Sequence, residues 1–70
     1  MFFAEDLLNK LKKNKIHFFA GVPDSVLKEF INILDFDSNV THYTVASEGL
    51  GVSLGIGYYL SSRKLPLIYM

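Results

Sequence analysis

Three short apolar runs that alternate with helix-like segments constrain the fold of this chain more than any other feature. The runs occupy residues 16–20, 40–45 and 66–70 and are rich in aromatic and β-branched side chains, which is typical of strands. A segment with helical spacing precedes each of them. Strands that alternate with helices form parallel sheets with right-handed crossovers. We therefore predict an α/β fold, a parallel sheet with flanking helices in the order α-β-α-β-α-β.

The first two helical segments each have one apolar face. In the first, acidic residues open the helix, lysines close it as the helix dipole favours, and the stripe comprises Phe3, Leu7, Leu8 and Leu11. The second follows a turn at Gly21 and Pro23, and either Asp24 or Ser25 can cap it. Its predicted core face comprises Val26, Leu27, Phe30, Ile31 and Leu34.

The third helical segment lies in the stretch "VASEGLGVSLGIG", residues 45–57, where Glu48 has no Lys or Arg close to it in sequence. Ser47 is the predicted N-cap of a helix from Glu48 to Leu60. The glycines do not form a dinucleotide-binding G-x-G-x-x-G, because Leu54 stands at the third position, and no Walker A sequence follows. We expect the small residues to thin the helix so that another backbone approaches closely. The simpler alternative is that Glu48 is an exposed first-turn acid.

Composition excludes several classes of function. Seven basic residues balance seven acidic ones, so no net charge attracts nucleic acid or an anionic membrane. There is no cysteine, which excludes disulfides and zinc ribbons and agrees with a cytoplasmic location. Hydrophobic residues make up 50% of only 70 residues, and the last apolar run reaches Met70 without a polar ending. We therefore expect a fragment of a longer protein.

Three segments together indicate a family: "FFAGVPDSVLKEF", "ASEGLGVSLGIGYYL" and "PLIYM". Over essentially the whole chain, the sequence resembles thiamine-diphosphate-dependent 2-oxoacid decarboxylases, and most closely the phosphonopyruvate decarboxylases. The most specific parts are "GVPDS" and the block "SEG…GYYL…YM". The resemblance implies that residues 1–70 are the N-terminal part of the domain that binds the pyrimidine ring of the cofactor, with no second domain present.

The resemblance also implies roles for individual residues. Glu48 occupies the position of the catalytic glutamate that hydrogen-bonds the ring nitrogen N1′, and an apolar pocket there would favour proton sharing with the ring. Gly21 and Pro23, in the turn after the first strand, are expected to be further cofactor-binding residues. Ser25 is the better candidate for a substrate-binding residue and Asp24 the second, although both could be N-caps alone.

The implied reaction of the full-length protein converts 3-phosphonopyruvate to phosphonoacetaldehyde and carbon dioxide, with thiamine diphosphate and Mg²⁺ as cofactors. The Mg²⁺ ligands are expected in a C-terminal domain that this chain lacks, so the chain alone is expected to be inactive and to hold no metal. A homo-oligomer or a partner subunit would supply that domain. The alternatives are a subunit of sulfopyruvate decarboxylase or of another 2-oxoacid decarboxylase, a non-catalytic docking domain, and a small nucleotide-binding module.

The remaining residues with possible chemistry are predicted to be structural. His17 and His42 each lie in a predicted strand without a partner at metal-ligand spacing. Tyr58 and Tyr59 end the third helical segment, where packing is the expected role.

Overall fold

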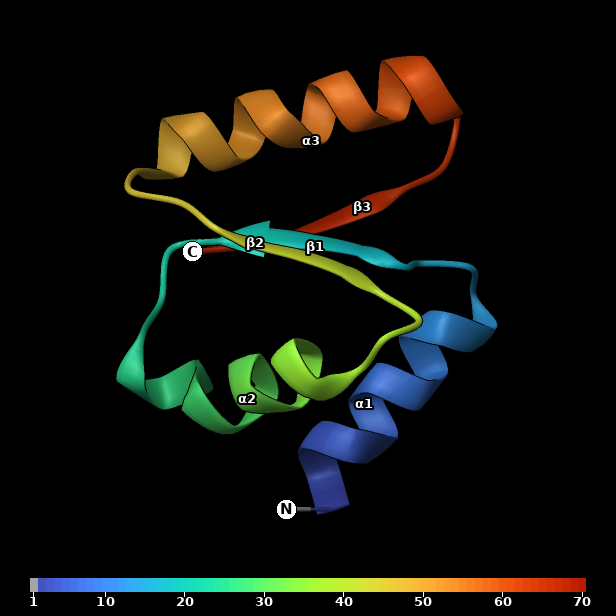
Figure 1. Ribbon diagram of the computed structural model, residues 1–70, viewed down its shortest axis with the longest axis vertical. Coiled ribbons are helices and arrows are strands. Elements are labelled where there is room, and N and C mark those ends of the chain that lie inside the picture. Colours follow the sequence, from blue (N-terminus) through green and yellow to red (C-terminus); the bar gives the residue numbers. More distant parts are fainter. Residues whose placement is uncertain (1) are drawn as a thin grey trace.

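The computed structural model describes residues 2–70, and the side chains from Ala4 onward. Its elements are α1 (Phe2–Lys13), β1 (Phe18–Gly21), a 3₁₀ helix η1 (Ser25–Leu27), α2 (Lys28–Phe36), β2 (Thr41–Thr44), α3 (Glu48–Ser62) and β3 (Pro66–Tyr69) (Figure 1). The three strands are parallel and lie in the order β2-β1-β3. The predicted α/β class is confirmed. The side chain of Phe3, part of the predicted first stripe, lies outside the described residues.

The three strands end level with one another. Gly21, the last residue of β1, pairs with Thr44 on one side and with Tyr69 on the other. The segments that leave the carboxyl ends of β1 and β2 therefore begin at the same edge of the sheet, where ligands bind in parallel α/β folds.

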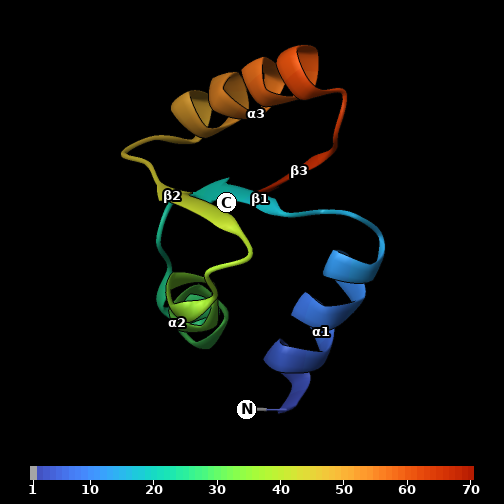
Figure 2. The ribbon, with the colours of Figure 1, turned by 45° about the vertical axis from the view of Figure 1, so that its right-hand side comes forward.

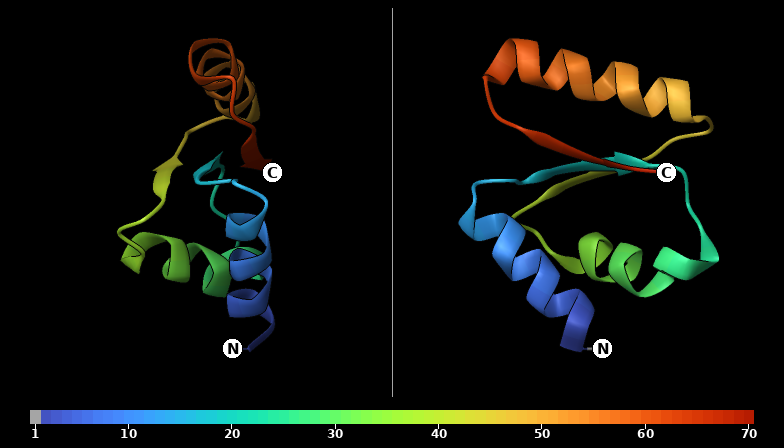
Figure 3. Two further views of the ribbon diagram at one scale, coloured as in Figure 1. Left: turned by 90° about the vertical axis from the view of Figure 1, so that its right-hand side faces the viewer. Right: turned by 180° about the vertical axis from the view of Figure 1, so that it is seen from behind.

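Helices cover both faces of the sheet (Figures 2 and 3). On one face, α1 and α2 pack over a core that comprises Ala4, Leu8, Phe19, Phe30, Leu34 and Tyr69. On the other face α3 contacts β1 and β3. There the ring of Tyr58 stacks on that of Phe18 with centroids 4.1 Å apart, so the predicted packing role of Tyr58 is confirmed, whereas Tyr59 is 42% exposed.

The first strand begins later than predicted because the end of α1 occupies the preceding residues. Lys15 adopts a left-handed conformation with φ 65°, and the Ile16 N–H donates to the Leu11 carbonyl at 3.0 Å. Ile16 and His17 are therefore a connection, and the strand comprises Phe18 to Gly21. Gly21, predicted as part of the turn, is instead paired in the sheet.

The second helical segment differs from the prediction at its start. The Asp24 carboxylate accepts a 2.8 Å hydrogen bond from the Val26 N–H, which confirms Asp24 as the cap. The turn that it caps is 3₁₀ rather than α, and the tighter spacing rotates Val26 out of the predicted core face. Val26 is 87% exposed, so its assignment to the core was wrong.

The third helix begins where the sequence predicted. The Ser47 hydroxyl accepts a hydrogen bond from the Leu50 N–H at 3.2 Å, and Glu48 stands in the first turn. The helix continues past Leu60 to Ser62, and Arg63 ends it in a left-handed conformation with φ 62°. No helix in residues 2–70 combines the length and the apolar character needed to cross a membrane.

Candidate functional site

The candidate site lies at the carboxyl edge of the sheet, where the turn after β1 and the start of α3 emerge (Figure 3). The turn at residues 22–24 leads into η1 on the face covered by α1 and α2, and the start of α3 lies on the opposite face (Figure 1). Four of the predicted residues are close together because they are near neighbours in sequence: Gly21, Pro23, Asp24 and Ser25. Glu48 lies at the same edge of the sheet, at the start of α3. No described hydrogen bond links Glu48 to the turn.

Glu48 is exposed and has no polar partner among the described residues. Its position in the first turn of α3 places the carboxylate near the positive end of the helix dipole. The expected apolar pocket around it is not formed by residues 2–70, and a Cβ built on the next residue, Gly49, would have no neighbour within 4 Å. Any wall that encloses this carboxylate must therefore come from another surface.

The glycines of α3 divide into two sets. A Cβ on Gly55 would lie 2.8 Å from Ile68 Cδ1, and one on Gly51 would lie 3.3 Å from Val45, so these two glycines let α3 lie close to β3. Gly49 and Gly57 have open space around them. The predicted thin helix is thus confirmed on the side facing the sheet, where the close neighbours are side chains of Val45, Ile68 and Pro66 rather than another backbone.

Gly21 has a structural reason to be glycine. A Cβ at this position would collide with the carbonyl oxygen and the ring of Tyr69. The missing side chain lets the Tyr69 ring lie across β1. Pro23 is exposed in the following turn and lines none of the cavities described below.

Ser25 lines a cavity of about 530 Å³, here named the α1-side cavity. Its walls come from α1, from η1 with the start of α2, and from β3, and its larger apolar members are Leu7, Val26, Leu27, Phe30, Leu67 and Tyr69. Lys28 and Glu29 stand beside Ser25 in the same lining. Asp24 does not line this cavity, and its carboxylate accepts the capping hydrogen bond instead.

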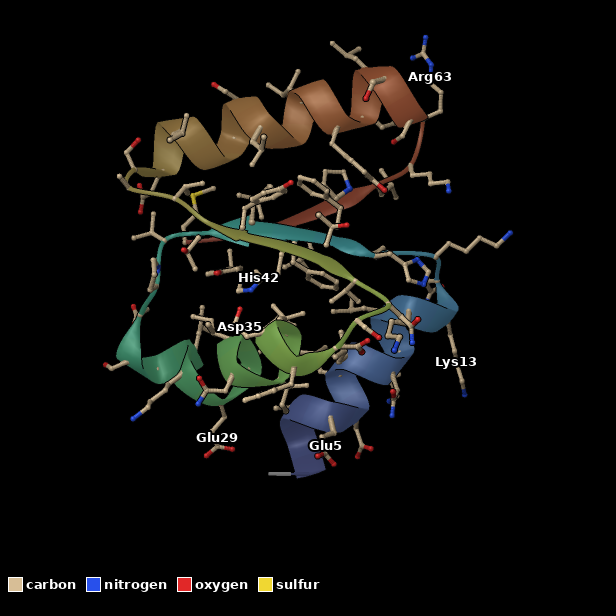
Figure 4. All side chains as sticks on the ribbon, viewed as in Figure 1. Glu5, Lys13, Glu29, Asp35, His42 and Arg63 are labelled. Carbon is tan, nitrogen blue, oxygen red and sulfur yellow. The ribbon has the colours of Figure 1, made fainter. Side chains whose placement is uncertain are left out.

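A polar network that the sequence did not reveal joins α2, β2 and β3, with a buried His42 side chain between the exposed Asp35 and the buried Tyr69. His42 Nδ1 lies 2.7 Å from Asp35 Oδ1, and His42 Nε2 lies 2.7 Å from the Tyr69 hydroxyl. Figure 4 shows Asp35 and His42 pointing toward each other. Because a carboxylate only accepts, Nδ1 carries the proton in this contact, and Nε2 lies within hydrogen-bond distance of the Tyr69 hydroxyl. Burial, and secondarily the charge of Asp35, raise the pKa of the Tyr69 phenol above its ordinary value.

This network confirms the prediction that His42 is a satisfied structural histidine, with a side chain only 4% exposed. Its partners lie 7 and 27 residues away in sequence, and no local pattern identifies partners at such separations. Within residues 2–70, no group of three or more His, Cys, Asp or Glu side chains is placed to hold a metal ion.

No family of known proteins, curated protein or solved structure matches this chain in sequence or structure comparisons.

Proposed function

We propose that this chain forms the pyrimidine side of a thiamine-diphosphate site in a 2-oxoacid decarboxylase. The observation that carries the proposal is the Glu48 carboxylate, which is exposed and unpaired in the first turn of α3, at the carboxyl edge of a parallel sheet. No lysine or arginine among the described residues forms an ion pair with it, so the carboxylate is available to share a proton with a ligand.

The residues present fit one wall of such a site. The Glu48 carboxylate would hold the proton at N1′ of the aminopyrimidine, and the open space beside Gly49 leaves room for the ring edge. When bound, the cofactor supplies the electron sink for loss of carbon dioxide from the 2-oxoacid. The diphosphate, its Mg²⁺ and the second face of the ring would be held by another domain or subunit.

The proposed substrate class is a small anionic 2-oxoacid, with 3-phosphonopyruvate first and sulfopyruvate as the nearest alternative. The Ser25 hydroxyl makes no described side-chain hydrogen bond and lines the α1-side cavity next to Lys28. A hydroxyl donor beside an ammonium group suits an anionic substrate. Gly21 would end the strand that leads into the turn, and Pro23 would shape the turn that presents Ser25. We place the reaction in the cytoplasm.

A non-catalytic docking domain is the second candidate. It is favoured by the apolar surface of α3, where Leu50, Ile56 and Leu60 are each more than half exposed. Such a domain would contribute a surface to a partner and would need no carboxylate at position 48.

Substitution of Glu48 separates the two candidates. In the assembled holoenzyme, loaded with thiamine diphosphate and Mg²⁺, Glu48→Gln should slow hydrogen-deuterium exchange at the cofactor C2 by about 10² to 10⁴, the usual effect of losing a general acid or base. Cofactor affinity should fall much less, because the amide keeps the shape of the side chain.

The matched control is Glu5→Gln, which changes another exposed acid in the first turn of a helix, α1. It should leave C2 exchange unchanged. Normal exchange in Glu48→Gln would contradict the catalytic role, and an assembly in which the wild-type chain binds no cofactor would favour the docking domain.

A further inference from the structure

The edge of the sheet formed by β3 has an apolar cavity on each face. β3 is an outer strand, paired with β1 alone among the described residues. Leu67 and Tyr69 line the α1-side cavity. Pro66 and Ile68 face the other way and line a second cavity of about 310 Å³, here named the α3-side cavity, with Val52, Ile56, Tyr59 and Leu60 of α3. Both faces beside this strand therefore offer apolar surface.

This edge carries none of the charges that usually protect an outer strand. β3 reads "PLIY", and every residue that lines the α3-side cavity is uncharged. Outer strands usually avoid pairing with other chains through lysines, prolines or bulges, and β3 has only Pro66, at its first position. The opposite edge, β2, reads "THYT" and is polar. The β3 edge is therefore the one suited to pairing.

We propose that β3 pairs with β3 of a second copy of this chain, antiparallel about a twofold axis perpendicular to the sheet. The two sheets would become one continuous sheet. The axis keeps both α3 helices on the same face, so the two α3-side cavities would cover each other, and so would the two α1-side cavities on the opposite face. The contact is isologous, so it closes at a dimer.

The charges of α3 favour a second copy over an unrelated partner. Glu48 is the only charged residue of the helix, Arg63 and Lys64 follow its last turn, and residues 49–62 carry no charge. Figure 4 shows Arg63 at the end of α3 that precedes β3. An antiparallel pair of these helices places the acidic end of each toward the basic end of the other, and it also opposes their dipoles favourably.

Exposed apolar residues on both faces would become buried in this dimer. Ile56 is 56% exposed beside the α3-side cavity, and Val26 is 87% exposed beside the α1-side cavity. The formal net charge of the chain is zero, so no overall repulsion opposes association of two copies. The inference shares the α1-side cavity with the proposed substrate site, but it rests neither on the cofactor nor on catalysis by Glu48.

The test is sedimentation velocity of the 70-residue chain over a concentration series, with one variant for each face. The wild-type chain should sediment as a dimer. Ile56→Lys and Val26→Lys should each raise the dimer dissociation constant about tenfold or more, because each buries a charge at the interface. The matched control, Phe36→Lys, changes a residue that is 91% exposed but lies outside both cavities, and it should leave dimerisation unchanged.

Two further measurements report on the geometry. Arg63→Glu combined with Lys64→Glu should weaken the dimer by opposing like charges at both ends, and this loss should shrink at high salt. Amide hydrogen exchange should be slower in β3 than in β2 at dimer concentrations, and the difference should fall on dilution.

A chain that is monomeric or unfolded at every concentration would overturn the proposal. So would assemblies larger than two, or a dimer weakened by Phe36→Lys and not by the other two lysine variants.

Discussion

The two faces of the sheet differ in how completely they are buried. Beneath the sheet, α1 and α2 enclose Phe19 and Leu34, which are at most 1% exposed, and the network of His42 adds polar contacts. Above it, α3 has only the glycines Gly51 and Gly55 buried, and it exposes most of its large apolar side chains. One face is a closed core. On the other, the sheet-facing side of α3 packs on the buried Phe18 through Tyr58, and the outer side of α3 is an open apolar surface.

This difference suggests that one face of the sheet stabilises the fold and that the other binds a partner. The closed face contributes the burial that stabilises the fold, since free energy scales with the apolar area removed from water. The open face keeps its apolar area for a partner, and it carries Glu48 at one end. Substitutions in the two faces should accordingly affect different measurements.

The largest expected effect comes from emptying the closed core. Phe19→Ala removes a fully buried ring and should cost about 3 to 5 kcal/mol, a large part of the roughly 3 to 10 kcal/mol typical of a chain of this size. The matched change on the open face, Leu50→Ala, truncates a side chain that is 54% exposed and should stay within about 0.5 kcal/mol. Urea unfolding followed by circular dichroism measures both. Equal losses in the two variants would show that the open face is also core.

The next effect compares one glycine from each face. Gly21→Ala forces a methyl group into the carbonyl and ring of Tyr69 and should destabilise the fold by about 1 to 3 kcal/mol. Gly57→Ala adds a methyl group in open space within α3 and should stabilise it by about 0.5 to 1 kcal/mol. Thermal melts of the two variants at one concentration give the comparison. A stabilising Gly21→Ala would mean that Tyr69 does not lie across β1.

The smallest effect concerns pH and belongs to the closed face, where Lys12 of α1 pairs with Asp37 at the end of α2. Lys12 Nζ lies 2.7 Å from Asp37 Oδ2, and this hydrogen bond, helped by the Asn39 N–H, lowers the pKa of Asp37 below its ordinary value of 3.8. A lowered folded-state pKa stabilises the fold above the unfolded-state pKa, and this stabilisation disappears as pH falls through the lowered value.

Removing Lys12 should therefore reduce the amount of folding stability that is lost as pH falls through the acid range, here called the acid limb of the stability curve. Lys12→Met should cost about 0.2 to 1 kcal/mol near neutral pH, with the difference from wild type vanishing below the lowered pKa. The control is Lys13→Met, an exposed lysine on the same helix, which should leave the acid limb in place. Urea midpoints measured across the acid range report both variants, and a Lys12→Met curve that keeps the full acid limb would argue against the pair.

Local sequence signals predicted the elements because each signal acts within a few residues. Ser47 caps α3 and Asp24 caps η1, as their side-chain chemistry favours. The error at Val26 arose because apolar spacing does not distinguish a 3₁₀ turn from the first turn of an α-helix. The late start of β1 depends on the left-handed Lys15, a conformation that its residue type does not signal.

The candidate site was less predictable because it depends on contacts between distant segments. The sequence marked Glu48 by its uncharged neighbourhood, yet burial depends on walls that the described residues do not form. The Asp35–His42–Tyr69 network brings together three elements, and only the fold makes them neighbours. Position 21 requires glycine because the carbonyl oxygen and the ring of Tyr69 occupy the space of a Cβ, and this contact joins residues that are far apart in sequence.

The bridge from His42 to Tyr69 has a consequence for how the sheet opens. β2 and β3 are not neighbours in the sheet, and each is paired by backbone only to β1. The side-chain bridge over Gly21 ties these two outer strands directly to each other. Peeling either strand away from β1 must break the imidazole contact as well as the backbone ladder, so the outer strands do not fray independently. The three strands should therefore behave as a single cooperative unit whose local openings approach those of global unfolding.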